Sequence, residues 1–481
     1  METSSAREAK SGGAVAAAHP RATEVGLDIL RAGGNAVDAA VAAQAMICVL
    51  MPQAAGLGGD VLALVHEAGT TTAINGVGLS PAAFAPPYTT DGGNSVTVPG
   101  LVDGWMTLHE RWGTLPLATL LTPAIAAAQE SRVDVPLMKA LNEQRERLLR
   151  YGGEAWALLG LHTDDIWHQP ELAALLQAIA SDGAHAFYHD GAEAIVRAVR
   201  SHGGTLDVAD LHQHQTLVNT PRSVAWGART LQVQPSPTQG VLLAMAAQWL
   251  DRQSALSDLD HLAVEATAAA FGYRDSVNAR TDLLKVDLDV STERASNRGG
   301  PRAYLHTAGV ATVDADGLTV SSLISVFDDF GSAVYVPELG IVLGNRAAGF
   351  TNGDNAPAPS SYPVHTLAPA MLIDADGTAH AIATPGADGQ VQTLLQVLIS
   401  ERFRDLTLAE AIARPRWRSQ SGSLLVEDDH PATGTLAALG HRIEVKERGD
   451  NLFGAVVAAG IRAGSPYAHA DWRRRQADGV A

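Results

Sequence analysis

Alternating apolar and polar residues predict three β-hairpins of one format along the chain. They are "VLALVHEAGTTTAING" (61–76), "GVATVDADGLTVSSLIS" (309–325) and "PAMLIDADGTAHAIATP" (369–385). Each places a polar, glycine-containing turn between two alternating runs. Asp-Gly at such a turn favours the positive φ that a tight hairpin needs. A fourth strand pair is predicted in "SAVYVPELGIVLGN" (332–345).

Helical periodicity dominates the rest of the chain. "TEVGLDILRAGG" predicts a helix with Thr23 as N-cap and Gly33 as its stop, and a second helix follows, capped by Asn35 with Asp38 three residues on. The apolar residues of the second helix, which includes Cys48, run around most of its circumference, which indicates burial between layers. Residues 101–300 read mostly as helix. Strands near both ends with helices between them predict an α/β fold with sheets packed between helical layers.

Composition limits the classes of protein to which the chain can belong. The 481 residues carry a net charge of −18, which excludes a long-range positive field for nucleic acid or anionic membranes. The single cysteine cannot form an internal disulfide, and the N-terminal residues lack a signal-peptide pattern, so we expect a cytoplasmic protein. The 17 histidines show no obvious ligand spacing with cysteine or acid, and "DLHQHQTL" (210–217) is interpreted as a solvated turn. No metal or other cofactor is expected.

Thr307, at the front of the second hairpin, is the candidate nucleophile. Cleavage of the peptide bond before it would free an α-amine with a pKa of about 7.7–8.0, able to take the proton of its own hydroxyl. The reaction also needs an oxyanion hole of N–H donors, and the turn "TPGADG" (384–389) offers closely spaced ones. From the residues alone, a structural threonine and an ordinary turn remain the commoner alternatives, and the pattern does not place the two together.

Several segments resemble the γ-glutamyltranspeptidase family of N-terminal-nucleophile hydrolases. They are "HPRATEVGLDILRAGGNAVDAAVAAQ", "MPQAAGLGGDVLALVHEAGTTTAINGVGLSPAA", "SVTVPGLVDGWMTLHERWGTLPLATLLTPAIAAAQE", "PSPTQG" and "FGSAVYVPELGIVLGN". The resemblance implies a proenzyme, or zymogen, that cuts itself between His306 and Thr307. It implies a heterodimer of a large subunit, 1–306, and a small subunit, 307–481, which form one four-layer αββα sandwich.

The resemblance also implies roles for other residues. Ser325 falls where the family has a side chain that supports the nucleophile, with a plain strand residue as the alternative. His365 and Thr366 fall on a substrate-facing pair, although an ordinary loop pair would look the same. Gly386 and Ala387 fall on the glycines that form the oxyanion hole. Because the donors are backbone N–H groups, alanine keeps this function if the turn geometry holds.

The residues at the positions that determine substrate specificity in the family depart from the family pattern. Val77 stands where the family has the arginine that pairs the substrate α-carboxylate, and valine cannot replace a guanidinium. Ala348 and Gly349 replace the acidic pair, and Phe327 replaces an asparagine. Arg346 is a new positive charge beside the lost pair. We expect it to bind a different substrate carboxylate, and the alternative is an ordinary surface arginine.

Together these features predict an autoprocessed hydrolase or acyltransferase acting on a small carboxylate-bearing amide or acyl substrate that is not γ-glutamyl. The resemblance extends to relatives that act on oxamate-like amides, on cephalosporin-like acyl groups, and on oxalyl-type carbon–carbon bonds in specialised metabolism. Glutathione hydrolase or γ-glutamyltransferase activity is the first alternative, and a non-catalytic fold is another. The expected partners are the substrate and the two fragments of one precursor.

Overall fold

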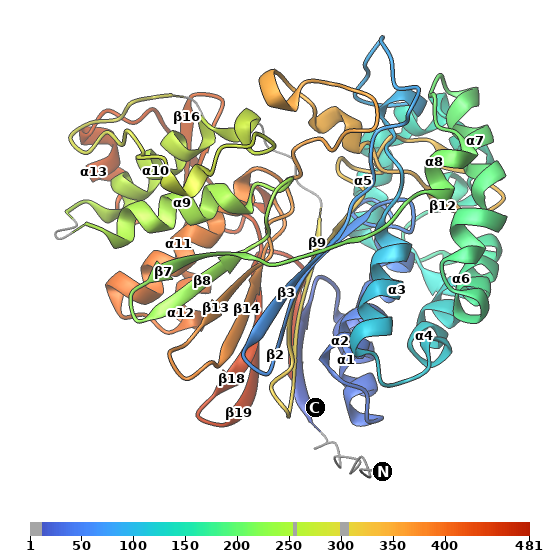
Figure 1. Ribbon diagram of the computed structural model, residues 1–481, viewed down its shortest axis with the longest axis horizontal. Helices are drawn as coiled ribbons and strands as arrows, with labels where there is room; N and C mark the ends of the chain where they lie inside the picture. Colours follow the sequence, from blue (N-terminus) through green and yellow to red (C-terminus); the bar gives the residue numbers. More distant parts are fainter. Residues whose placement is uncertain (1–11, 254–256, 299–306) are drawn as a thin grey trace.

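A computed structural model, which describes residues 12–253, 257–298 and 307–481, shows two large β-sheets face to face with helices outside both (Figure 1). Helices α9 to α13 cover one side and α1 to α8 the other. This is the four-layer αββα sandwich expected from the sequence. Among the described residues, no helix combines the length and apolar character needed to cross a membrane.

The first sheet has seven strands and joins distant parts of the chain. In spatial order they are β20 (Ala477–Val480), β1 (Gly13–Ala17), β9 (Ala308–Asp314), β10 (Thr319–Ser325), β2 (Asp60–Glu67), β3 (Thr70–Gly76) and β6 (Leu217–Asn219). β1 lies antiparallel between β9 and β20, and β10 pairs with β2. Segments on both sides of Thr307 therefore form one continuous sheet.

The second sheet has six strands, and three smaller sheets accompany the pair. Its order is β19 (Ser465–Ala470), β18 (Val457–Arg462), β14 (Ala379–Ala383), β13 (Ala370–Ile373), β8 (Arg229–Val233) and β7 (Arg222–Trp226). The smaller sheets are β15 (Trp417–Gln420), β16 (Ser423–Glu427) with β17 (Ile443–Lys446); β11 (Tyr335–Val336) with β12 (Ile341–Val342); and β4 (Ser131–Arg132) with β5 (Ile166–Trp167).

The helices divide between the two outer layers. Beside the first sheet lie α1 (Pro20–Arg31), α2 (Ala36–Leu50), α3 (Leu101–Trp112), α4 (Leu117–Gln129), α5 (Val135–Arg150), α6 (Pro170–Asp182), α7 (Ala192–Ser201) and α8 (Val208–His212). Beside the second lie α9 (Gly240–Asp251), α10 (Leu259–Phe271), α11 (Gly389–Arg404), α12 (Leu408–Ala413) and α13 (Thr433–Ala438).

Strand β1 shows why its sequence is apolar throughout. Ala14 and Ala16 face the layer between the sheets, whereas Val15 and Ala17 face the helices. Successive side chains on a strand point to opposite faces, so a strand covered on both sides needs apolar residues at every position.

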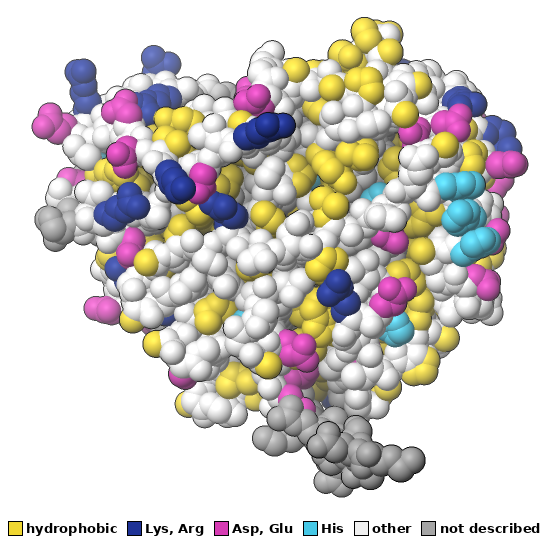
Figure 2. Space-filling model, viewed as in Figure 1, with side chains coloured by type: hydrophobic (Ala, Val, Ile, Leu, Met, Phe, Trp, Pro, Cys, Tyr) yellow, Lys and Arg dark blue, Asp and Glu magenta, His cyan; other side chains and the backbone are white. Residues whose placement is uncertain are grey.

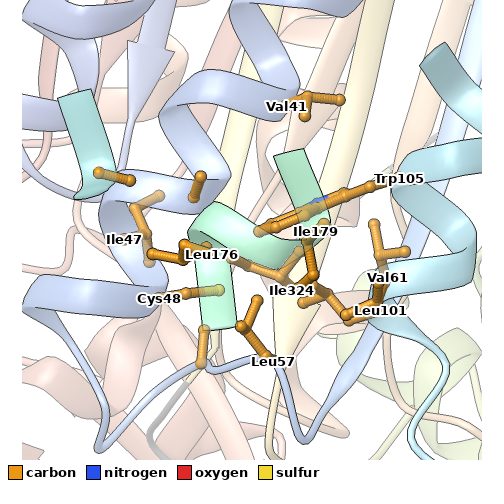
Figure 3. Packing of buried hydrophobic residues seen from close by; sticks show 14 of the residues in the cluster. Val41, Ile47, Cys48, Leu57, Val61, Leu101, Trp105, Leu176, Ile179 and Ile324 are labelled. Carbon is orange, nitrogen blue, oxygen red and sulfur yellow. The ribbon is translucent and has the colours of Figure 1, made fainter. Parts of the chain in front are cut away.

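A buried chain of hydrogen bonds ties the helical layer to the strand pair that carries the candidate nucleophile. The Trp105 indole N–H on α3 donates to Gln44 Oε1 on α2 at 2.7 Å, and Gln44 Nε2 donates to Ser322 Oγ on β10 at 2.8 Å. Ser322 Oγ then donates to the Val310 carbonyl on β9 at 3.0 Å. The surrounding cluster is apolar, with Trp105 lying across it (Figure 3), so these polar groups depend on one another for partners.

The helix starts were predicted with mixed success. Asn35 and Asp38 form the expected capping box at the start of α2, which is buried all round. The prediction of Thr23 as an N-cap is wrong, because α1 begins at Pro20 with His19 as its cap. The Thr23 hydroxyl instead donates to the Ala477 carbonyl at 2.9 Å and fastens α1 to the C-terminal strand.

The strand pairs were predicted more reliably than the strands outside them. All four predicted pairs are antiparallel in the structure. The region 101–300 is mainly helical, as expected, but β7 and β8 also lie within it and complete the second sheet. Each has only five residues and buries alternate ones.

Candidate active site

Thr307 lies directly before β9 and is 5% exposed. Its hydroxyl donates to Ser325 Oγ, at the end of β10, over 3.3 Å. Ser325 Oγ also accepts the Phe327 backbone N–H at 3.0 Å, so its position is fixed from a second side. The structure thus brings together the residues assigned as nucleophile and support. His306, the other half of the expected cleavage site, lies outside the described residues.

The turn assigned as the oxyanion hole has the unusual backbone it needs. Gly386 has φ = +128° and Ala387 has φ = +49°, both in the region that L side chains rarely adopt. Among the described residues no acceptor takes either N–H. The turn leads into α11, a helix of 16 residues, whose N-terminal end favours negative charge.

The nucleophile and this turn border the same cavity. Thr307 and Pro385, the residue before Gly386, both line a space of about 340 Å³. The sheets approach closely here, since a β-carbon on Gly309 would lie 2.9 Å from Val457 and 3.8 Å from Ala383. The fold therefore brings the start of β9 to the end of β14, which the sequence pattern could not establish.

Gln239 connects the oxyanion turn to the predicted substrate-facing pair. Its side chain is fully buried, and Nε2 donates to the Thr366 carbonyl at 2.5 Å and to the Ala387 carbonyl at 2.8 Å. Gln239 belongs to the "PSPTQG" segment, but the sequence did not indicate what its side chain holds. One amide thus fixes two backbone segments beside the site.

A buried charge cluster lies next to the nucleophile. Arg346 Nε donates to Asp60 Oδ2 at 3.0 Å, and His365 Nε2 lies 3.0 Å from the same oxygen. Arg346 Nη1 lies 3.4 Å from Thr366 Oγ1, and its guanidinium sits 4.2 Å above the Phe327 ring. Asp60 is also the register partner of Ser325 across β2 and β10.

In the uncut chain Arg346 is 1% exposed and does not line the cavity that Thr307 borders. It is therefore not a surface arginine. Four residues assigned to substrate binding, Arg346, His365, Thr366 and Phe327, form one cluster around Asp60. Val77 is fully buried in the apolar layer between the sheets, with Leu62 and Leu367 in the same cluster.

The hydrogen bonds define the protonation of this cluster. His365 Nδ1 accepts the Leu367 N–H at 3.1 Å, so Nε2 carries the proton and donates to Asp60. Burial and the nearby Arg346 lower the pKa of His365 to about 4. Burial opposes ionisation of Asp60, but hydrogen bonds from His365 and Arg346 outweigh it and hold the pKa of Asp60 below its ordinary value.

These shifts give a pH prediction. Because the pKa of His365 falls to about 4 on folding, its contribution to stability is complete above about pH 6.5 and is lost as the pH falls toward 4. The loss amounts to about 1.4 kcal/mol for each unit of depression. We expect chemical denaturation of His365→Gln to show a smaller loss between pH 6.5 and 4 than wild type. His162→Gln, at an exposed position, is the control. Equal pH dependence in His365→Gln and wild type would contradict this assignment.

Three consecutive arginines that the sequence reasoning missed, Arg473, Arg474 and Arg475, line the cavity. Arg474 is half-buried, and its Nη2 donates to the Asn451 carbonyl at 2.6 Å. Arg475 is exposed and pairs with Asp134 at 2.9 Å. Burial and the nearby Arg418 lower the pKa of Arg474 to about 10, so it remains cationic at neutral pH. The sequence feature that could have identified these arginines is their run in "DWRRRQ", which is unusual in a chain of net charge −18.

The first arginine of that run anchors the other two. Arg473 is buried and pairs with Glu427 at 2.7 Å and with Asp471 at 3.1 Å. Asp471 also pairs with Arg416 at 2.6 Å. This network fixes the backbone from which Arg474 and Arg475 reach the cavity.

Comparisons with known proteins show which family the chain belongs to. The sequence model of the gamma-glutamyltranspeptidase family matches residues 22–481. The chain is 33% identical to an oxamate amidohydrolase proenzyme of Klebsiella pneumoniae, covering 90% of this chain and 91% of that protein. It is 26% identical to a glutathione hydrolase proenzyme of Bacillus subtilis, covering 89% and 85%.

A solved structure gives the same answer for the fold. The cephalosporin acylase of Bacillus halodurans superposes with a TM-score of 0.86 at 28% identity, covering 100% of this chain and 98% of that one. The chain therefore belongs to the gamma-glutamyltranspeptidase family, an enzyme family of the N-terminal-nucleophile hydrolase class.

Proposed function

We propose that the chain is an autoprocessed amide or acyl hydrolase that cuts itself between His306 and Thr307. The observation that carries the proposal is the placement of Thr307, with its hydroxyl bonded to Ser325 and a cavity wall shared with Pro385. The proenzyme names of the relatives support processing. The products would be fragments 1–306 and 307–481, held together by the shared sheets.

The chemistry follows from these positions. In the precursor, the Thr307 oxygen attacks the preceding carbonyl carbon, the C–N bond breaks, and water hydrolyses the resulting ester. The freed α-amine then takes the hydroxyl proton when the Thr307 oxygen attacks a substrate acyl carbon. The N–H groups of Gly386 and Ala387 stabilise the oxyanion, the leaving group takes the proton, and water releases the acyl group.

We infer that the substrate is small, bears a carboxylate and is not γ-glutamyl. A glutamyl head group would find Val77 in place of a cation, and Ala348 and Gly349 in place of acids, leaving both of its charges unpaired. Arginines lie near the site instead: Arg346 packs against the Phe327 ring, and Arg474 and Arg475 line the cavity with Thr307. The oxamate amidohydrolase relative acts, by its name, on a compound of this size and charge.

Substrate comparison tests this inference. We expect kcat/KM for oxamate to exceed that for oxamide, its neutral diamide analogue, by roughly tenfold or more, because a charged hydrogen bond contributes about 1.5–3 kcal/mol. γ-Glutamyl-p-nitroanilide is expected to turn over slowest. Robust release of p-nitroaniline would favour glutathione hydrolase activity and refute the pocket assignment. Cleavage of an oxalyl carbon–carbon bond with no amide turnover would favour the specialised-metabolism activity that the resemblance also implies. A cytoplasmic location and a role in specialised metabolism stay predictions from the sequence.

A further inference from the structure

A second cluster of reactive side chains lies away from Thr307, between α10 and the segment that leads into β17. His261 and Glu265 are four residues apart on α10 and so share one helix face. His441 comes from the segment between α13 and β17. All three are buried, with exposed fractions of 1%, 2% and 8%.

The geometry of this cluster is that of a set of metal ligands. One ring nitrogen from each histidine and one oxygen of Glu265 lie within 4.8 Å of one another. His261 Nδ1 and His441 Nε2 are 2.8 Å apart. Among the described residues, Glu265 Oε2 is buried without a hydrogen-bond partner. A buried polar atom in this state is costly, and a bound cation would satisfy it.

The surroundings favour a cation over an ordinary histidine pair. Glu265 Oε1 accepts the Ser296 N–H at 3.1 Å, which orients the carboxylate. A cavity of about 20 Å³ lined by Glu265, Ser296 and His441 has room for one water molecule.

We propose that His261, Glu265 and His441 bind a first-row divalent cation, with Zn²⁺ the best match. Two imidazoles, one carboxylate and a water complete a tetrahedral set of nitrogen and oxygen ligands. Zn–N bonds of about 2.0–2.1 Å require the two nitrogens to move apart by about half an ångström. The expectation of no metal site overlooked the His-x-x-x-Glu spacing on α10 and could not foresee the approach of His441.

The position of the site gives it a structural role. His261 and Glu265 precede Thr307 in the chain, and His441 follows it. The neighbouring backbone is already joined, since the Ala295 N–H donates to the Leu439 carbonyl at 2.8 Å. If the chain is cut before Thr307, which rests on the proposed function, the metal holds the two fragments together. Metal binding itself does not depend on the cut.

The test uses the full-length protein, stripped with a chelator, incubated with Zn²⁺ and desalted. We expect one equivalent of retained zinc by mass spectrometry of the metal, a higher Tm, and visible absorption bands when Co²⁺ replaces Zn²⁺. Glu265→Gln, which keeps the side-chain shape, and His441→Asn are expected to weaken Zn²⁺ binding by more than about tenfold. Thr307→Ala is expected to bind zinc as wild type does, which separates this proposal from the proposed processing.

An exposed group of histidines provides the control. The rings of His185, His189 and His212 stack with centroid distances of 4.6 Å and 4.2 Å, and histidines gather over the α8 region on the face shown in Figure 2. His189→Asn is expected to retain zinc fully. Two outcomes would overturn the proposal: wild type retaining no more zinc than Glu265→Gln, or zinc lost in His189→Asn and kept in His441→Asn. The buried cluster would then be a hydrogen-bonded histidine pair only.

Discussion

Replacing Thr307 with alanine is expected to leave the chain as one uncut polypeptide with no measurable hydrolase activity. The side-chain oxygen is the group that attacks in both processing and turnover, and alanine removes it while leaving β9 and its pairing intact. On a denaturing gel, wild type should run as two bands corresponding to 1–306 and 307–481. The variant should run as a single band of about 50 kDa, from the chain mass of 50.2 kDa.

Two further variants separate chemistry from folding. Thr307→Ser keeps a hydroxyl and should still cut, whereas Ser325→Ala removes the group that receives the Thr307 hydrogen bond and should slow both steps. Circular dichroism should be the same for all of them, because each change is small and lies at a strand end. Cleavage of Thr307→Ala at the wild-type position would remove the proposed mechanism.

The second large effect is expected at Arg346. Under the proposed function, the substrate carboxylate reaches the buried Arg346 only after the chain is cut before Thr307, and the guanidinium then helps bind it. Arg346→Ala should therefore raise KM for oxamate about 10- to 100-fold, the equivalent of roughly 1.5–3 kcal/mol. Self-cleavage should change much less. The same change leaves Asp60 buried without its cation, which should lower the free energy of unfolding by about 3–5 kcal/mol.

A double variant resolves these two consequences. Arg346→Met with Asp60→Asn replaces the buried ion pair by neutral groups of similar size, and such replacements are often neutral or stabilising. We expect it to recover most of the lost stability, measured by chemical denaturation, without recovering KM for oxamate. If KM recovers together with stability, or if Arg346→Ala loses cleavage and binding equally, Arg346 has a structural role only. Arg474 and Arg475 would then be the residues that bind the substrate carboxylate.

Much of the fold could be predicted because its signals are local. Alternation and glycine-containing turns, Asp-Gly in two cases and Ala-Gly in the third, fix the three hairpins, and their register follows once the turn is set. The capping box at Asn35 is equally local. The start of α1 was misplaced because His19 is not among the preferred capping residues, whereas Thr23 is. The Thr23 hydroxyl bonds instead to a strand 454 residues away, and no local pattern reports such a partner.

The residues of the site also divide into those that the sequence identified and those that only the fold revealed. Thr307, Ser325, Gly386 and Ala387 were identifiable by resemblance. The structure adds that the Thr307 hydroxyl bonds to Ser325, and that Thr307 shares a cavity with Pro385, the residue before Gly386. The pairing of Arg346 with Asp60 spans 286 residues, so only the fold could show that this arginine is buried. His441 reaches His261 across 180 residues for the same reason. Contacts of this range depend on how the layers pack, which sequence periodicity does not encode.

The most direct test is intact-mass analysis of purified protein while it turns over substrate, combined with N-terminal sequencing of any smaller fragment. A small fragment beginning at Thr307, gaining the mass of the acyl group when the reaction is quenched, is the expected result. Active protein that consists of one unbroken polypeptide would contradict the account.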